Sequence, residues 1–141
     1  MATRTEQRRA AIWALYQADL LDRPLDETFP RDVHVFTREL ATQTRAHQPE
    51  LDELIERHAT GWTLGRIAPL ERSILRVALL EILHPELTPG NVPIPPEGAI
   101  DEAVETAKEF CGADAPKFVN GVLGAVVRET HVAPSEGTLQ P

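Results

Sequence analysis

Hydrophobic residues in this 141-residue chain recur mostly at helical spacing. The clearest stripe places six residues on one face of a helix with 3.6 residues per turn: Leu51, Leu54, Ile55, His58, Ala59 and Trp62. Weaker stripes of the same kind run from Phe29 to Leu40 and from Ile100 to Cys111, where Gly112 provides a typical helix end. The pattern therefore predicts helices over most of the chain.

Two further helices have recognisable starts. Pro69 suits the first position of a helix that continues to Ile82, and Asp114 can cap a helix that continues to Val126. No segment alternates hydrophobic and polar residues as a half-buried strand does. We expect an all-α fold of six to seven helices, a single domain over residues 1–133 made of two packed sub-bundles at about 1–63 and 67–133.

Prolines mark the remaining boundaries. They are densest from Pro85 to Pro96, which predicts an extended loop because proline interrupts both helices and interior strands. The last residues, 134–141, are rich in small and polar side chains, so we expect a flexible tail there.

Charge is unevenly distributed along the chain. There are 14 basic and 22 acidic residues, a net charge of −8, which argues against a protein that coats nucleic acid through cationic charge alone. Arg4, Arg8 and Arg9, however, are opposed only by Glu6 at the start of the chain. A local basic site is therefore compatible with the acidic total.

Several classes of function find no support in the residue patterns. Cys111 is the only cysteine, no hydrophobic run reaches the roughly 18 residues of a membrane helix, and the N-terminus does not have the pattern of a signal peptide. The histidines are scattered, without the spacing of metal ligands, and no nucleophile has a neighbouring base. We expect a cytoplasmic, non-catalytic protein without metal or cofactor.

Two segments are candidates for binding nucleic acid. Arg4 and Arg8 share a helix face, and Tyr16 offers a ring on which a base could stack. Lys117 and Phe118 lie in the first turn of the last helix, where backbone N–H groups favour an anion. From the residues alone, ordinary surface arginines and a core Phe118 explain the same pattern.

Several motifs together resemble the NusB family of bacterial transcription antitermination factors. They follow the family's order and spacing over roughly residues 4–127: Arg8-Arg9-Ala10, Leu15-Tyr16-Gln17, Leu70-Glu71-Arg72, Ile74-Leu75-Arg76-Val77-Ala78, Ile100-Asp101-Glu102-Ala103-Val104 and Lys117-Phe118-Val119-Asn120-Gly121-Val122-Leu123. The last string is the most specific of these motifs. The resemblance implies an all-helical fold.

The resemblance also implies a function. NusB proteins bind boxA RNA together with NusE, a ribosomal protein, and join other Nus factors on RNA polymerase during ribosomal RNA synthesis. By position, the RNA contacts would be made by Arg4, Arg8, Arg9, Tyr16, Asp114, Lys117 and Phe118. Glu71 and Arg76 would lie on the helix turned toward NusE.

Some features of the sequence leave alternatives open. Thr5, Glu6 and Gln7 interrupt the basic arm that is denser in many family members, so we expect weak RNA affinity without NusE. Some family members form homodimers, and the sequence does not decide whether this chain does. A NusB-like fold also occurs as the N-terminal domain of an RNA cytosine methyltransferase, so an interaction module without RNA of its own is the alternative function.

Overall fold

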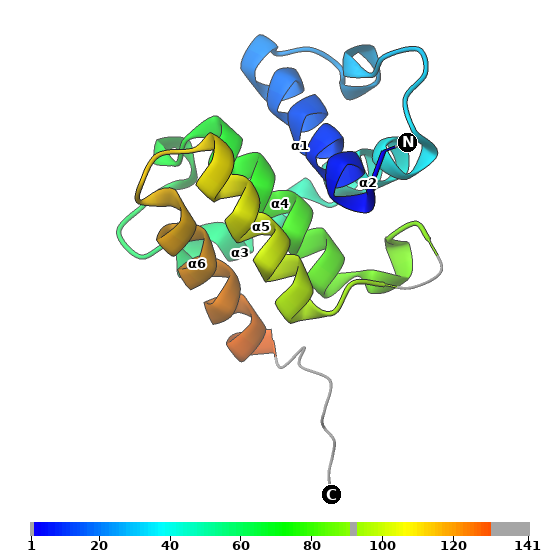
Figure 1. The fold of residues 1–141 in the computed structure, drawn as a ribbon. Helices are drawn as coiled ribbons and strands as arrows, with labels where there is room; N and C mark the ends of the chain where they lie inside the picture. Colours follow the sequence, from blue (N-terminus) through cyan, green and yellow to red (C-terminus); the bar gives the residue numbers. More distant parts are fainter. Residues whose placement is uncertain (1, 91–92, 131–141) are drawn as a thin grey trace, which may run out of the picture.

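The computed structural model describes residues 2–90 and 93–130, which form six α-helices and three short 3₁₀ turns (Figure 1). The α-helices are α1 (Arg4–Leu21), α2 (Val35–Ala46), α3 (Gln48–His58), α4 (Pro69–Leu83), α5 (Pro96–Phe110) and α6 (Ala115–Thr130). The 3₁₀ turns are η1 (Leu25–Thr28), η2 (Leu64–Arg66) and η3 (Pro85–Leu87). These residues include no strand, which confirms the predicted all-α class.

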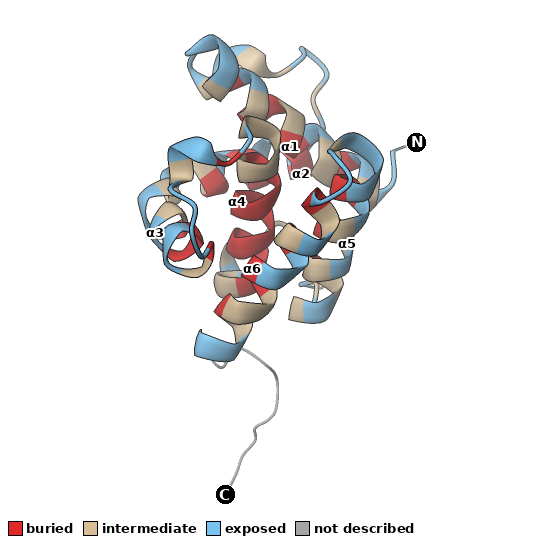
Figure 2. Ribbon diagram, turned by 90° about the vertical axis from the view of Figure 1, so that its left-hand side faces the viewer, coloured by how far each residue is buried: buried red, intermediate tan, exposed pale blue. Residues whose placement is uncertain are grey.

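Helix α4 lies at the centre of the fold and contacts each of the other five α-helices. Every residue from Ser73 to Ile82 is buried, and Figure 2 shows this helix enclosed by the others. A helix buried on all sides has to be apolar on all sides. Leucine, isoleucine, valine and alanine accordingly occupy most of this segment.

Two charged residues lie within this buried segment of α4, and both are paired. Arg76 is 4% exposed and binds Asp19 of α1 at 2.6 Å and Asp52 of α3 at 2.7 Å. Glu81 is 2% exposed and binds Arg8 of α1 at 3.0 Å. Two ion pairs, more than a helical turn apart, thus fasten α1 to the central helix.

One hydrophobic core connects the helices of both halves of the chain. Helices α5 and α6 pack against each other and against α4, while α1 packs between α2 and α4. The division into sub-bundles at 1–63 and 67–133 stays a prediction. None of the helices in the described ranges combines the length and the apolarity needed to cross a membrane.

The predicted end of α3 was wrong. This helix ends at His58, and Trp62 lies beyond it with 49% of its surface exposed instead of continuing the buried stripe. Gly61 adopts a φ of 83°, a left-handed conformation that redirects the chain just before the tryptophan. The spacing of Trp62 matched a helix, but the chain stops being helical first.

The predicted stripe from Phe29 to Leu40 also crosses a break. Helix α2 begins only at Val35, so Phe29 and Val33 precede it in the connection from α1. Phe36 and Leu40 are buried within the helix as expected. The 3.6-residue spacing was fortuitous across a proline-containing segment.

Two predicted helix starts, at Pro69 and after Asp114, are confirmed, whereas the predicted proline-rich loop contains further helical starts. Pro69 is the first residue of α4, and Asp114 directly precedes α6 with its carbonyl accepting the Phe118 N–H at 3.2 Å. Within the expected loop, Pro85 starts the turn η3 and Pro96 starts α5, because a first helical position needs no N–H donor. The predicted tail, 134–141, lies outside the described residues.

The buried arginine gives a first test of the fold. Arg76→Ala would leave Asp19 and Asp52 without their partner, and we expect it to lower the free energy of unfolding by about 3 kcal/mol. Arg23, whose pair with Glu27 is more than half exposed, is the control, and Arg23→Ala should cost less than about 1 kcal/mol. Urea unfolding followed by circular dichroism measures both, and equal losses would contradict the buried role.

Candidate nucleic-acid interface

The capped start of α1 fixes the directions of its arginines. The Thr3 hydroxyl accepts the Glu6 N–H at 3.1 Å, and the Glu6 carboxylate accepts the Thr3 N–H at 2.7 Å. This reciprocal pair satisfies N–H groups at the helix end, so the helix is regular from Arg4 onward. Arg4 and Arg8, four residues apart, therefore share a face, as predicted, whereas Arg9 is turned away from it.

The face that carries Arg4 and Arg8 is directed toward the protein interior. Both guanidinium groups lie over the ring of Phe36, at 4.0 and 5.6 Å from its centre. Arg8 is 12% exposed, and its Nε donates to both carboxylate oxygens of Glu81 at 3.0 and 3.1 Å. Desolvation raises the pKa of Glu81, and the hydrogen bond from Arg8 acts in the opposite direction.

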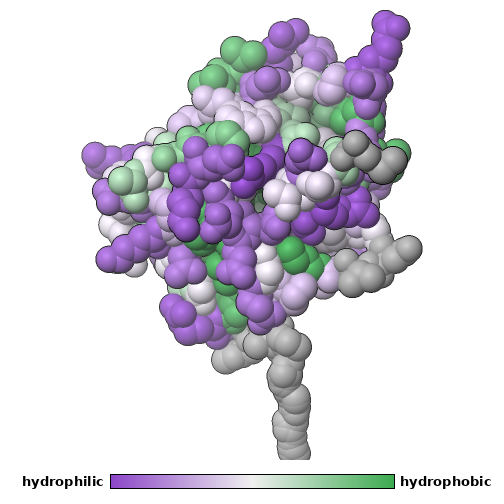
Figure 3. Space-filling model, viewed as in Figure 1, coloured by the Kyte–Doolittle hydropathy of each residue, from purple (hydrophilic) through white to green (hydrophobic). Residues whose placement is uncertain are grey.

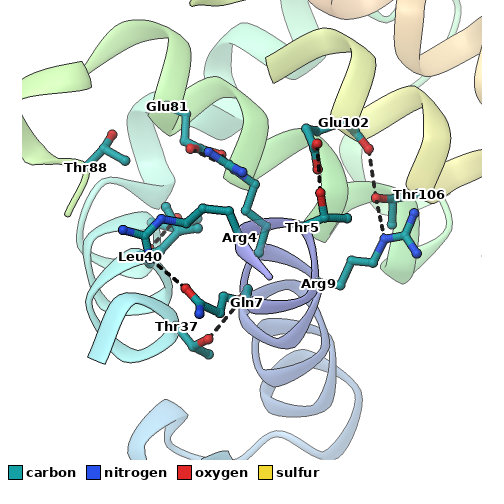
Figure 4. A network of polar contacts seen from close by, with 12 residues as sticks. Arg4, Thr5, Gln7, Arg9, Thr37, Leu40, Glu81, Thr88, Glu102 and Thr106 are labelled. Atoms are coloured by element: carbon teal, nitrogen blue, oxygen red, sulfur yellow. Dashed lines mark hydrogen bonds and ion pairs between the residues drawn. The ribbon is translucent and has the colours of Figure 1, made fainter. Parts of the chain in front are cut away.

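The three arginines predicted to contact RNA from α1 differ in how accessible they are and in the direction they face. Arg8 is committed to a buried pair and has little surface to offer a ligand. Arg4 is exposed on its outer side, although it also donates to the Gln7 side chain at 2.6 Å. Figure 4 shows Arg4 and Arg9 extending to opposite sides of α1. The three arginines therefore do not form one basic patch.

Arg9 lies on the second face of α1, toward the end of α5. Its guanidinium pairs with Glu109 at 2.5 Å, approaches the Thr106 hydroxyl at 3.4 Å and lies 5.4 Å from the centre of the Phe110 ring. Trp13 and Tyr16 follow at i+4 and i+7 on this face. Arg9 and Tyr16, two of the predicted contacts, are thus brought together.

Two of the three predicted contacts at the start of α6 line a groove of about 470 Å³. Phe118 and Asp114 line it, together with Trp62, whose ring centre lies 6.3 Å from that of Phe118. Lys117 is exposed in the first turn of α6. Phe118 is half-buried and packs against the core, so it combines a core contact with an accessible edge.

The two residues expected to face a protein partner differ sharply. Glu71 lines the same groove and is half-buried, and desolvation raises its pKa. Arg76, in contrast, is 4% exposed and paired with Asp19 and Asp52, so it has almost no surface with which to contact a partner. Its position in α4 makes it a structural residue, which corrects its assignment as a direct partner contact.

Sequence reasoning missed two aromatic residues near these contacts. Phe110 is 41% exposed at the end of α5, and Trp13 packs edge-on against it with ring centres 5.4 Å apart. Helical spacing from Arg9 could have indicated Trp13. Phe110 carried no such signal, because its neighbour on α1 is nearly a hundred residues away in the sequence.

Comparison with known proteins finds the same fold in solved NusB structures. The NusB of T. maritima superimposes with a TM-score of 0.74 at 29% identity and covers 91% of this chain and 92% of its own. A crystal structure of antitermination factors NusB and NusE in complex with dsRNA gives a TM-score of 0.74 at 25% identity, covering 89% of this chain and 96% of that one. A model of the NusB family matches residues 5–128.

The chain belongs to the NusB family. Curated relatives described as transcription antitermination protein NusB include one from Halalkalibacterium halodurans, 38% identical over 82% of this chain and 87% of that protein. Another, from Desulfotalea psychrophila, is 39% identical over 89% of this chain and 96% of that protein. NusB membership confirms the resemblance, and the family is one of regulatory RNA-binding proteins.

Cys111 provides a chemical probe of the groove. Burial raises the pKa of its thiol, and the negative charge of the nearby Glu71 raises it further. Glu71→Gln removes that charge, so we expect a lower thiol pKa and faster alkylation by iodoacetamide at neutral pH. Glu97→Gln, at the other end of α5, should leave the rate unchanged, and a rate unaffected by Glu71→Gln would contradict this arrangement.

Proposed function

We propose that this chain is a transcription antitermination factor that binds single-stranded boxA RNA together with NusE. In this function it joins other Nus factors and RNA polymerase in the cytoplasm and performs no catalysis itself. The main observation in support is that a NusB fold places accessible aromatic and basic side chains on α1 and at the start of α6. The solved complex of a related NusB with NusE and RNA supports both partners.

In this proposal the accessible cationic side chains bind the RNA phosphates and the accessible aromatic rings bind the bases. Arg9, Lys117 and the outer side of Arg4 would hold phosphates, which supply affinity without reading sequence. Tyr16 and Phe118 would stack on splayed bases, the usual way in which single-stranded RNA is recognised. Arg8 would contribute indirectly by holding α1 against α4.

The start of α6 suits an anion for a second reason. In its first turn the Ala115 N–H donates to the Gly112 carbonyl at 3.0 Å, the Phe118 N–H donates to the Asp114 carbonyl at 3.2 Å, and Pro116 has no N–H. The Lys117 N–H is therefore the backbone donor that this turn can offer an anion, and the helix dipole favours negative charge at this end. Lys117 adds a full positive charge there, and Asp114 occupies the cap position beside it. A phosphate near Lys117, with a base against Phe118, uses this positive charge and the helix dipole, and it has to lie away from the Asp114 carboxylate, which repels it.

NusE would supply the positive charge that this acidic chain lacks. With a net charge of −8, the chain alone gains little from counterion release beyond its few accessible cations. A basic partner docked along the groove beside Glu71 would extend the cationic surface, and opposite charges would speed the association. RNA affinity should therefore rise when NusE is bound.

A salt titration tests the proposal. Binding of a boxA RNA to the chain with and without NusE is measured by fluorescence anisotropy over a series of salt concentrations. Lys117→Ala should weaken binding and reduce the salt slope by about one phosphate contact. Phe118→Leu should weaken binding about tenfold without changing the slope, because it removes stacking and leaves the charges in place.

The controls separate RNA binding from folding and from partner binding. Arg38→Ala, on the exposed side of α2, serves as a charge control and should leave the slope unchanged. Glu71→Lys should reduce the gain in affinity that NusE provides. Equal binding of boxA RNA and an unrelated duplex, or a slope indifferent to Lys117, would contradict the proposed function.

A further inference from the structure

Two histidines lie side by side where the corner between α2 and α3 meets the end of α4. His47 joins α2 to α3, and His84 directly follows the last residue of α4. Their ring centres are 4.9 Å apart, with 39° between the ring planes. Glu71 lies in the first turn of α4, so this histidine pair and the groove beside Glu71 are at opposite ends of the central helix.

Two carboxylates from different elements flank His84. The Glu50 carboxylate of α3 lies 2.9 Å from the His84 Nε2, and the Glu86 carboxylate of η3 lies 3.4 Å from the His84 Nδ1. Polar side chains cover most of the face that Figure 3 shows, so an exposed carboxylate by itself would indicate no site. Two adjacent imidazoles with a carboxylate between them are different, because these are the ligand types that transition-metal ions prefer.

The His47 ring is held in the way that metal-bound histidines are held. Its Nδ1 lies 2.9 Å from the backbone carbonyl oxygen of Gln43. A carbonyl oxygen only accepts hydrogen bonds, so in the neutral ring Nδ1 carries the hydrogen and Nε2 keeps a free lone pair. Histidines that bind a metal almost always donate their second ring N–H in this manner, which fixes the tautomer and the orientation of the ring.

The spacing of these groups fits a single shared ion. When two imidazoles bind one tetrahedral Zn²⁺ through bonds of about 2.0–2.1 Å, their ring centres lie about 5 Å apart. The rings of His47 and His84 already have this separation. The 2.9 Å between the His84 Nε2 and the Glu50 carboxylate is close to the roughly 3.3 Å between neighbouring ligand atoms of such an ion.

On these grounds we propose that His47, His84 and Glu50 bind a divalent transition-metal ion of the Zn²⁺ class. In the described ranges no three His, Cys, Asp or Glu side chains already enclose an ion, so binding has to rearrange this cluster. The ion takes the place of the hydrogen between the His84 Nε2 and Glu50, and the His47 ring turns toward it. The hydrogen of His84 moves to Nδ1, where the Glu86 carboxylate accepts it, as in the carboxylate–histidine–zinc arrangement of metal sites.

A shared ion stabilises the folded chain, because it joins the α2–α3 corner to the end of α4 and the unfolded chain has no such site. After removal of metals with EDTA, Zn²⁺ at about a hundred times its Kd should raise the Tm by about 5–10 °C, measured by circular dichroism. Mg²⁺ prefers oxygen ligands, so the same concentration of Mg²⁺ should leave the Tm unchanged. This site is independent of the proposed function.

Calorimetric titration of the full chain with ZnCl₂ identifies the ligands. His47→Gln and His84→Gln each remove a ligand and should weaken Zn²⁺ binding by at least about a hundredfold, whereas Glu86→Gln removes only the support of His84 and should weaken it about tenfold. His58→Gln is the matched control, because His58 also pairs with a carboxylate, that of Glu129 at 2.8 Å, but lies at the other end of α3. This control should leave Zn²⁺ affinity unchanged.

The wild-type chain gives a readout that does not depend on how the variants fold. On addition of Zn²⁺, the imidazole NMR signals of His47 and His84 should shift together and saturate at one ion per chain, while those of His58 stay in place. The proposal is overturned if ZnCl₂ shows no saturable binding or if Mg²⁺ raises the Tm equally. It is also overturned if His58→Gln, or Cys111→Ala at the only thiol, weakens Zn²⁺ binding as much as His47→Gln does.

Discussion

Two ion pairs on the central helix determine where the rest of the molecule can lie. Helix α4 is buried on all sides, yet it carries Arg76 and Glu81, whose charges could not remain unpaired there without a large desolvation cost. Asp19 and Arg8, both from α1, meet these charges more than one turn apart along α4. Helix α1 therefore has both its position and its rotation about its own axis fixed.

The rotation of α1 about its axis decides which of its side chains pack inside the protein and which are available to bind RNA. With Arg8 turned inward to Glu81, the neighbouring Arg9 is turned toward α5, and Trp13 and Tyr16 follow on that face. Adjacent arginines thus serve different purposes.

Much of the fold was predictable because it depends on local signals. Proline at the first position of α4 and Asp114 before α6 mark helix starts that hold in the structure. The roles of Arg8 and Arg76 were not predictable in the same way, because the carboxylates that bind them come from other helices. Phe110 was missed for the same reason, since its exposure beside Trp13 arises only from packing.

The most direct test of this account compares Arg8→Ala with Arg9→Ala in stability and in RNA binding. Arg8→Ala should lower the free energy of unfolding by about 3 kcal/mol, because Glu81 loses its partner, and should leave the salt slope of RNA binding unchanged. Arg9→Ala should change stability by less than about 1 kcal/mol and reduce the salt slope by about one contact. Equal effects of the two substitutions on the salt slope, or a stable Arg8→Ala protein, would contradict it.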